Sequence, residues 1–337
     1  MAERDMAARD DRSAEERLIA RCFGPLATHP GALGLADDAA VLTPPPGCDL
    51  VLTTDGVIAG VHFFADDPPE TVGRKVLRMN LSDLAAKGAR PAGFLLSIAL
   101  PAGIDEAWLT AFTAGLGDDA RHYQCPLLGG DTDHTPGPIS VSIAAFGTVP
   151  TGKMVRRATA KPGDRIVVTG TIGDAALGVL LRRDAGLTQR LRLSDEASAY
   201  LQDRYLKPQP RNALAAVVLQ HASAAMDVSD GLAGDLAKLC RASGVAAEVD
   251  GVRVPLSAAA LTALAADPGL FETALTGGDD YEILLTLPAE RLEAFRAAAT
   301  DAGVAVTEIG RIVAGQGTRF TRSGKALDFA RTSYSHF

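Results

Sequence analysis

Apolar residues occur along this chain in two patterns, short continuous runs and positions spaced three to four residues apart. The two patterns alternate, which predicts strands followed by helices. Aliphatic and β-branched residues fill positions 49–54, which indicates a strand that ends in a turn at Asp55 and Gly56. Apolar positions spaced three to four residues apart then predict a helix from about Pro69. Three further segments follow, strands at 94–100 and 139–149 and a helix at 106–120. The pattern predicts alternating strands and helices over roughly the first 150 residues.

A change of composition near residue 150 predicts two domains. Turn-forming and basic residues fill 150–164, and a new apolar run at 165–169 starts a second αβ unit. We expect an N-terminal αβ domain at 15–149 and a C-terminal αβ domain at 150–337. Residues 1–14 are charged and small, so a mobile N-terminus is expected, with a capping box from Ser13 to Glu16 opening a short helix.

Length and composition narrow the class of protein. The chain has 337 residues, 47% hydrophobic and 22% charged, which is typical of a globular protein of about two domains. No apolar run reaches the roughly 18 residues of a membrane helix, and the four cysteines form no C-x-x-C pair. A formal charge of -8 argues against nucleic-acid binding. We expect a cytoplasmic protein with no membrane or nucleic-acid partner.

Five short acidic phrases are the most informative chemical signal. They are Ala36-Asp-Asp38, Asn80-Leu-Ser-Asp83, Gly129-Gly-Asp-Thr-Asp133, Asp227-Val-Ser-Asp-Gly231 and Gly277-Gly-Asp-Asp280. Any one of them alone is typical of a helix cap or an Asx-turn. Together they favour a cluster of oxygen ligands for Mg²⁺, which binds one or two carboxylates plus substrate phosphates. The six histidines form no zinc motif.

Common phosphate-binding sequences are absent. The chain has no G-x-x-x-x-G-K-[ST] loop, no G-x-G-x-x-G after a strand and no H-R-D kinase loop. The glycine-containing turn at 169–173 precedes a predicted helix, where it is as typical of a plain αβ turn as of an anion site. An acidic protein that handles a nucleotide is therefore expected to take it as a Mg²⁺ complex.

The acidic phrases and their neighbours, taken in order, resemble those of the thiamine-monophosphate kinases. This family belongs to the superfamily of aminoimidazole ribonucleotide synthetase and selenophosphate synthetase. The matching phrases include Thr53-Thr-Asp-Gly56, the run from Met79 to Pro91, Leu128-Gly-Gly-Asp-Thr132, Lys161-Pro-Gly-Asp164, Met226-Asp-Val-Ser-Asp-Gly-Leu232 and Thr276-Gly-Gly-Asp-Asp-Tyr-Glu282. Gly60-Val-His-Phe63 and Tyr334-Ser-His-Phe337 point to the thiamine branch.

The resemblance implies a fold and a reaction. The fold is α/β (α+β) with two domains: an N-terminal αβ domain that pairs its sheet across a homodimer, and a C-terminal ferredoxin-like αβ domain. The reaction moves the γ-phosphoryl of ATP onto thiamine monophosphate and yields thiamine diphosphate. Transfer is direct and in line, assisted by several Mg²⁺ ions, with no catalytic side chain.

The resemblance also implies roles for individual residues. The implied metal ligands are Asp38, Thr53, Thr54, Asp55, Asp83, Asp131, Asp227 and Asp230. The implied nucleotide contacts are Gly130, Asp131, Arg157 and Ser229, and the implied contacts with thiamine phosphate are His62, Asp279 and Tyr334. The chain departs from the family pattern at Asp279, where Glu is usual, and at Ala36, where Gly is usual.

Three alternatives stay open at the level of sequence. One is another ATP-using enzyme of the same superfamily. The second is a sensor that binds thiamine phosphate or a nucleotide without turnover, for which Asp279 is the only sign. The third is an acidic structural module, which would show no Mg²⁺-dependent nucleotide binding.

Overall fold

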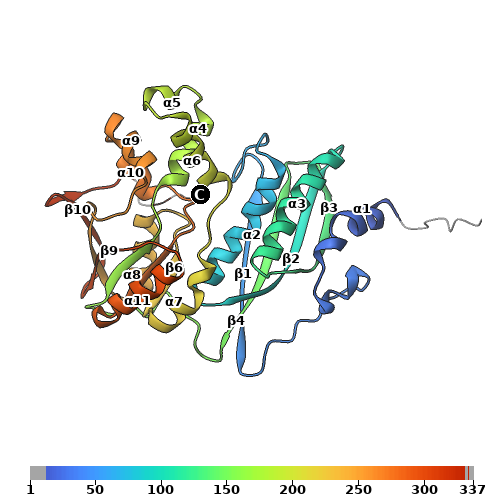
Figure 1. Cartoon of the computed structure of the whole chain (residues 1–337), viewed down its shortest axis with the longest axis horizontal. Helices are drawn as coiled ribbons and strands as arrows, with labels where there is room; N and C mark the ends of the chain where they lie inside the picture. Colours follow the sequence, from blue (N-terminus) through green and yellow to red (C-terminus); the bar gives the residue numbers. More distant parts are fainter. Residues whose placement is uncertain (1–12, 331–332, 334–337) are drawn as a thin grey trace, which may run out of the picture.

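The structure, a computed structural model that describes residues 13–330 and 333, has two α/β halves arranged along its longest axis (Figure 1). Each half has its own β-sheet and hydrophobic core. Strands of the first sheet lie within residues 48–150 and those of the second within 165–327. This arrangement supports our proposal of domains at 15–149 and 150–337.

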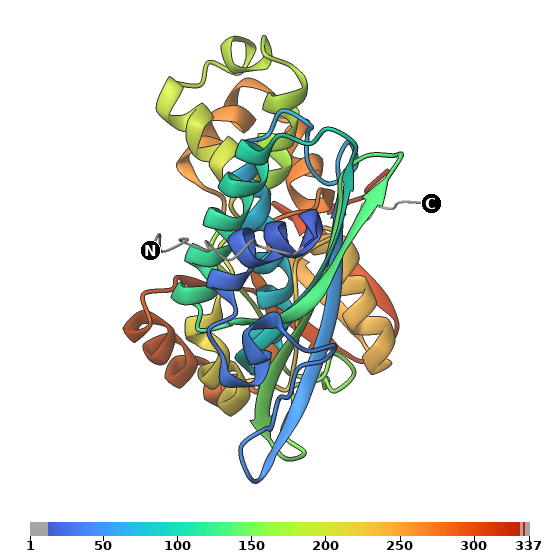
Figure 2. The same cartoon turned by 90° about the vertical axis from the view of Figure 1, so that its right-hand side faces the viewer.

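The first half is a four-stranded sheet covered by helices on one face. Its strands are β1 Cys48–Ile58, β2 Arg90–Pro101, β3 Leu127–Thr135 and β4 Ser140–Pro150, in the order β1-β4-β2-β3. Its helices are α1 Ala14–Cys22, α2 Pro69–Ala86 and α3 Glu106–His122, with 3₁₀ turns at Gly24–Leu26 and Pro30–Leu35. β1 and β4 form a long antiparallel ribbon that extends below the helices (Figure 2).

The second half is a seven-stranded mixed sheet in the order β11-β10-β7-β9-β5-β8-β6. Its strands are β5 Arg165–Thr169, β6 Ala224–Asp227, β7 Ala246–Asp250, β8 Ile283–Leu287, β9 Val306–Val313, β10 Gly317–Arg322 and β11 Lys325–Leu327. Its helices are α4 Asp174–Arg183, α5 Leu187–Arg190, α6 Asp195–Leu206, α7 Ala215–His221, α8 Leu232–Ser243, α9 Ala258–Ala266, α10 Leu270–Thr276 and α11 Leu292–Asp301, with 3₁₀ turns at Asn212–Leu214 and Ala289–Arg291. Residues of α4, α6 and α8–α10 pack in one core cluster, and residues of α7 and α11 in another.

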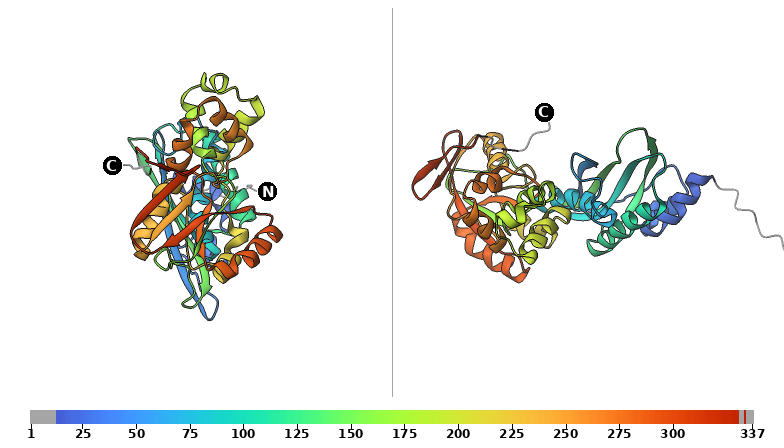
Figure 3. Two further views of the ribbon diagram at one scale, coloured as in Figure 1. Left: turned by 90° about the vertical axis from the view of Figure 1, so that its left-hand side faces the viewer. Right: turned by 90° about the horizontal axis from the view of Figure 1, so that it is seen from above.

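Helix α2 joins the halves because it is buried on almost every side. Its buried positions include both apolar residues and the polar Lys75, Arg78, Asn80 and Ser82. It packs on β1 and β4 of its own sheet, and on β6, β8, α6 and α7 of the other half. Seen from above, α2 lies where the two halves meet (Figure 3).

Several predicted elements are confirmed. The helices expected from about Pro69 and at 106–120 are α2 and α3, and the strand expected at 139–149 is β4. The capping box is also present: the Ser13 hydroxyl accepts the Glu16 N–H at 3.1 Å, and the Glu16 carboxylate accepts the Ser13 N–H at 2.5 Å.

One predicted turn is wrong. Asp55 and Gly56 do not form a turn, because β1 continues through them and pairs Asp55 with Ile143 and Gly56 with Ser142. A Cβ at position 56 would lie 2.6 Å from the Ser142 hydroxyl, which can rotate away, and 3.1 Å from the Val141 carbonyl oxygen, so the neighbouring strand packs tightly against this glycine. Residues 129–133 also lie within a strand, β3.

Two terminal predictions fall outside the described residues. These are the mobile segment 1–14, except for Ser13 and Ala14, and the substrate contact Tyr334 with the rest of the closing phrase. Within residues 13–330 and 333, no helix combines the length and apolar character needed to cross a bilayer.

We expect Gly115 to be required by the close packing of α2 against α3. A Cβ at Gly115 would lie 2.0 Å from the Glu70 carbonyl oxygen, so Gly115→Ala must push the helices apart. We expect this substitution to lower the free energy of unfolding by about 1–3 kcal/mol in spite of alanine's better helix propensity. Denaturant unfolding measures it, with exposed Ala114→Ser as the matched control. A Gly115→Ala protein as stable as the control would contradict this packing.

Candidate functional site

Carboxylates from both halves meet beside the C-terminal part of α2. Asp83 on α2 accepts a hydrogen bond at 2.5 Å from the Thr53 hydroxyl of β1. Asp55, two residues further along β1, is close enough to Asp83 and Asp230 for both to raise its pKa. The charges of Asp83 and Asp55 in turn contribute to a raised pKa of Asp227. Five of the predicted metal ligands therefore form one group, which we call the junction cluster: Thr53, Asp55, Asp83, Asp227 and Asp230.

Local structure explains how these side chains come together. Alternate residues of a strand point to opposite faces, so Thr53 and Asp55 both point toward α2. The Asn80 side chain of α2 accepts the Asp55 N–H at 3.0 Å and fixes the strand against the helix. Asp227 is the last residue of β6, and Asp230 follows in the loop before α8. The cluster is therefore built from a strand face, a helix end and a strand end.

The junction cluster is electrostatically unfavourable without cations. Burial, followed by repulsion from Asp83 and Asp230, raises the pKa of Asp55 from 3.8 to about 7. Burial and neighbouring carboxylates also raise the pKa of Asp227, which is only 6% exposed. Desolvation and like charge both disfavour ionised carboxylates, so the folded protein carries this cluster at a cost in stability.

Basic residues border the cluster and compensate it in part. Lys238 on α8 forms ion pairs with Asp230 and, at 2.8 Å, with Asp235. Lys87, just after α2, donates to the Ala225 carbonyl at 2.8 Å. Burial and the charge of nearby Arg157 lower the pKa of Lys87, whereas Asp227 and Asp83 act in the opposite sense. Arg157 is exposed, so its guanidinium is available beside the cluster.

The donor chemistry of the junction cluster fits Mg²⁺. Its ligands are carboxylate and hydroxyl oxygens, which hard divalent cations prefer, and its mutual repulsion is what such cations relieve. Within residues 13–330 and 333, no three histidine, cysteine, aspartate or glutamate side chains are close enough to form a ready-made metal cage.

His62 and Asp279 lie together at a second position along the same junction. The Lys75 ammonium on α2 donates to the Asp279 carboxylate at 2.9 Å and to the His62 carbonyl oxygen at 3.1 Å. The Tyr205 hydroxyl also donates to that carbonyl, at 3.3 Å. Two of the three predicted substrate contacts are therefore tied to one buried lysine.

The two acidic loops of the second half are joined by backbone hydrogen bonds. The Asp279 N–H donates to the Ser229 carbonyl at 2.9 Å, and the Tyr281 N–H donates to the Val228 carbonyl at 2.8 Å. A Cβ at Gly278 would lie 2.3 Å from the Ser229 carbonyl oxygen, so only glycine permits this approach. The loop with Asp227 and Asp230 and the loop with Asp279 thus form one unit, which we call the paired loops.

Four predicted residues lie elsewhere. They are Asp38, Thr54, Gly130 and Asp131, and they line a cleft of about 780 Å³ against the other face of the first sheet. Thr54 points away from α2 because its strand neighbours Thr53 and Asp55 point toward it. Within one chain, the structure does not bring these four residues to the junction cluster.

Comparisons with known proteins identify the family. Residues 36–149 match the AIR synthase related protein, N-terminal domain, and residues 161–323 match its C-terminal domain. The chain is 43% identical to the thiamine-monophosphate kinase of Caulobacter vibrioides over 99% of this chain and 96% of that protein. The chain belongs to the thiamine-monophosphate kinase family.

Solved structures agree with this membership. The crystal structure of thiamine-monophosphate kinase from Stenotrophomonas maltophilia K279a has a TM-score of 0.82 and 39% identity, covering 93% of this chain and 98% of that one. AaThiL complexed with AMPPCP and TMP has a TM-score of 0.75 and 30% identity, covering 96% of this chain and 94% of that one. The predicted two-domain α/β fold is confirmed, whereas sheet pairing across a dimer stays a prediction.

Sequence reasoning missed the lysines and the tyrosine that support the candidate site of this thiamine-monophosphate kinase family member. Lys75 lies on the apolar stripe of α2 between Val72 and Val76, and a lysine in such a stripe signals a buried charge with a partner. Lys238 lies three residues after Asp235 on α8, a spacing that places the two side chains on one helix face. Tyr205 carried no signal, because only the fold brings α6 to α2.

The two departures from the family pattern have different consequences. Ala36 has a φ of -103°, so the usual glycine is not needed there for a left-handed backbone. Asp279 has a φ of +73°, a conformation that aspartate tolerates better than most residues. Its shorter side chain is held by Lys75 and so lies in a defined position.

We expect Asp55→Asn to stabilise the metal-free protein. Because the pKa of Asp55 is raised in the folded protein, the wild-type protein loses stability as the pH rises from about 4 to 7 and this carboxyl ionises. Asparagine does not ionise, so the variant avoids that loss. The gain should be on the order of 1–3 kcal/mol at pH 8 in a chelating buffer, and should vanish below about pH 4. Thermal unfolding across pH measures it, with exposed Asp133→Asn as the control. Equal stability of wild type and Asp55→Asn at pH 8 would contradict the strain assigned to the cluster.

Proposed function

We propose that the protein phosphorylates thiamine monophosphate with ATP and Mg²⁺ to give thiamine diphosphate and ADP. The observation that carries this proposal is the junction cluster, where oxygen ligands from both halves converge beside the paired loops. Family membership and the AaThiL relative complexed with AMPPCP and TMP support the two substrates. The alternatives of another superfamily enzyme or a sensor are not favoured by these relatives.

The main obstacle in this reaction is repulsion between two anions. Two unit charges about 4 Å apart repel by roughly 4 kcal/mol at an effective dielectric of about 20, and both substrates carry more than one charge. Mg²⁺ supplies the neutralising charge that lets the phosphates approach in line. Thr53, Asp55, Asp83, Asp227 and Asp230 are the residues proposed to hold it.

The acceptor requires no general base. The second pKa of a phosphate monoester is about 6, so the acceptor is mostly dianionic at neutral pH. This agrees with a site built from carboxylates, with no histidine inside the junction cluster. We propose direct transfer, with His62 and Asp279 positioning the acceptor and exposed Arg157 and the Ser229 loop facing the nucleotide. Tyr334 stays a predicted contact with the acceptor.

The roles assigned by resemblance to Asp38, Thr54, Gly130 and Asp131 also stay proposals. The four residues line one cleft, so they belong together spatially, although apart from the junction cluster. Gly130 has a structural reason to be glycine, because a Cβ there would lie 1.9 Å from the Leu96 carbonyl oxygen. We also keep a cytoplasmic location as a proposal, which the four unpaired cysteines support.

The reaction is tested by incubating the purified protein with ATP, Mg²⁺ and either thiamine monophosphate or free thiamine. We expect thiamine diphosphate and ADP to form in equal amounts with thiamine monophosphate and not with free thiamine. Phosphorus NMR monitors both products. Asp55→Asn should lower the rate at least 100-fold because it removes a metal ligand, and Asp133→Asn should not. Absence of product with the wild-type protein, or a phosphorylated protein on the reaction path, would refute the proposal.

We propose a homodimer formed through the face of the first sheet opposite α2 and α3. Leu52 on this face is 66% exposed, and Leu50 and Leu95 line the same cleft. An exposed apolar sheet face of this kind is typical of an interaction surface.

We expect Leu52→Asp to convert the dimer to a monomer in sedimentation velocity, because a carboxylate would be buried in the interface. Val252 lies in the second half and is 60% exposed, so Val252→Asp is the matched control and should stay dimeric. A wild-type monomer, or equal behaviour of the two variants, would show that this face is not the interface.

A further inference from the structure

Lys75 is a buried charge in the middle of α2 that the proposed chemistry does not use. Its side chain is 3% exposed. The ammonium donates to Asp279 and to the His62 carbonyl, and its nitrogen lies 3.8 Å from the centre of the Tyr205 ring. A buried ammonium is retained only where it is paired and hydrogen-bonded, and these three contacts use its full capacity.

The contacts of Lys75 connect two loops from different halves. His62 belongs to the loop between β1 and α2, whereas Asp279 belongs to the paired loops of the second half. Lys75 is the charged donor that bridges the Asp279 carboxylate and the His62 carbonyl oxygen, and without it these two groups would keep only hydroxyl donors, from Tyr281 and Tyr205. Lys75 therefore sets how far apart these two predicted substrate contacts lie.

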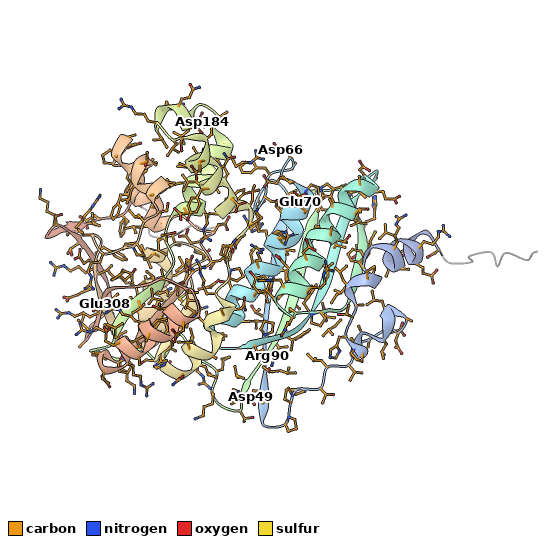
Figure 4. The ribbon with its side chains drawn as sticks, viewed as in Figure 1. Asp49, Asp66, Glu70, Arg90, Asp184 and Glu308 are labelled. Atoms are coloured by element: carbon orange, nitrogen blue, oxygen red, sulfur yellow. The ribbon has the colours of Figure 1, made fainter. Side chains whose placement is uncertain are left out.

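The loop that carries His62 is also fastened to the second half at its far end. Arg182 on α4 pairs with Asp67 at 2.8 Å and with Asp66 at 3.0 Å. The Tyr205 hydroxyl also lies 3.2 Å from the Asp67 carboxylate, so its single proton is shared between Asp67 and the His62 carbonyl, and Tyr205 contacts both parts of the loop. Asp66 lies at the junction between the halves, above α2 (Figure 4). The loop is thus fixed at Lys75 and at Arg182.

We propose that Lys75 is a positioning residue that fits the acceptor pocket to thiamine monophosphate by holding His62 and Asp279 in one arrangement. The inference rests on the proposed function and deepens it. Tyr205 supports the same arrangement through its ring, which lies under the ammonium, and through its hydroxyl.

The effect of Lys75 is expected on the acceptor and not on the nucleotide. Asp83 lies eight residues beyond Lys75 on α2, which is about 12 Å along a helix axis. Asp279 is held directly by Lys75, whereas Asp55 and Asp83 are held by Asn80 and Thr53. A change at Lys75 therefore disturbs the acceptor side first.

The test compares steady-state constants of Lys75→Met and of Lys153→Met, which replaces an exposed lysine. We expect Lys75→Met to raise KM for thiamine monophosphate at least tenfold and to change KM for ATP by less than about twofold. Tyr205→Phe keeps the ring but removes the hydroxyl contacts, so we expect a smaller rise, about threefold, again in the acceptor KM alone. Lys153→Met should match the wild type.

A second variant separates positioning from stability. In the double variant Lys75→Met, Asp279→Asn, no carboxylate is left uncompensated, so the melting temperature should recover relative to Lys75→Met and thereby measure how much of the single variant's instability comes from the unpaired Asp279. Unchanged acceptor KM in Lys75→Met, or an equal rise in both KM values, would overturn the inference. If Lys75→Met does not fold, Tyr205→Phe decides by the same criterion. Failure of the wild-type protein to form thiamine diphosphate would instead refute the proposed function.

Discussion

The burial of α2 on both sides is the constraint on which the rest of the structure depends. Most polar side chains of a helix buried between two sheets cannot reach bulk water, so each of these must find a partner in the protein. Arg78 does so with Asp119 at 3.0 Å and the Pro208 carbonyl at 2.9 Å, and Asn80 does so with the backbone of β1. The partners belong to both halves, and the same helix therefore packs the molecule and builds its site.

The fold was largely predictable, because hydrophobic periodicity locates long elements well. α2, α3 and β4 follow from spacing alone, and the ordered acidic phrases identify the family. Asp55-Gly56 was misjudged as a turn because aspartate and glycine are typical of turns, and β3, which is rich in the same residues, was not predicted. In this chain Asp55 and Gly56 lie inside β1, where they pair with Ile143 and Ser142 of β4, and the Asp55 N–H bonds to the Asn80 side chain of α2.

The site was predictable as a set of residues but not as a geometry. The sequence motifs assign the same role, metal ligand, to Asp55 and Asp131. The alternation of strand faces and the sheet order nevertheless place the two residues on opposite sides of one sheet. The contributions of Lys75 and Tyr205 depend on contacts between segments more than 100 residues apart, as the separation of 143 between Tyr205 and His62 illustrates. No local pattern records such a contact.

The paired loops have a consequence for how such a site tolerates sequence change. Backbone N–H and carbonyl groups set the spacing between the loop of Asp227 and the loop of Asp279, and every residue except proline carries both groups. The spacing between the two loops therefore does not depend on the side chain at position 279, provided that Gly231 and Gly278, which pack against the opposite loop, remain. Substitution of a family glutamate by Asp279 alters the reach of a single carboxylate without moving the frame that holds it.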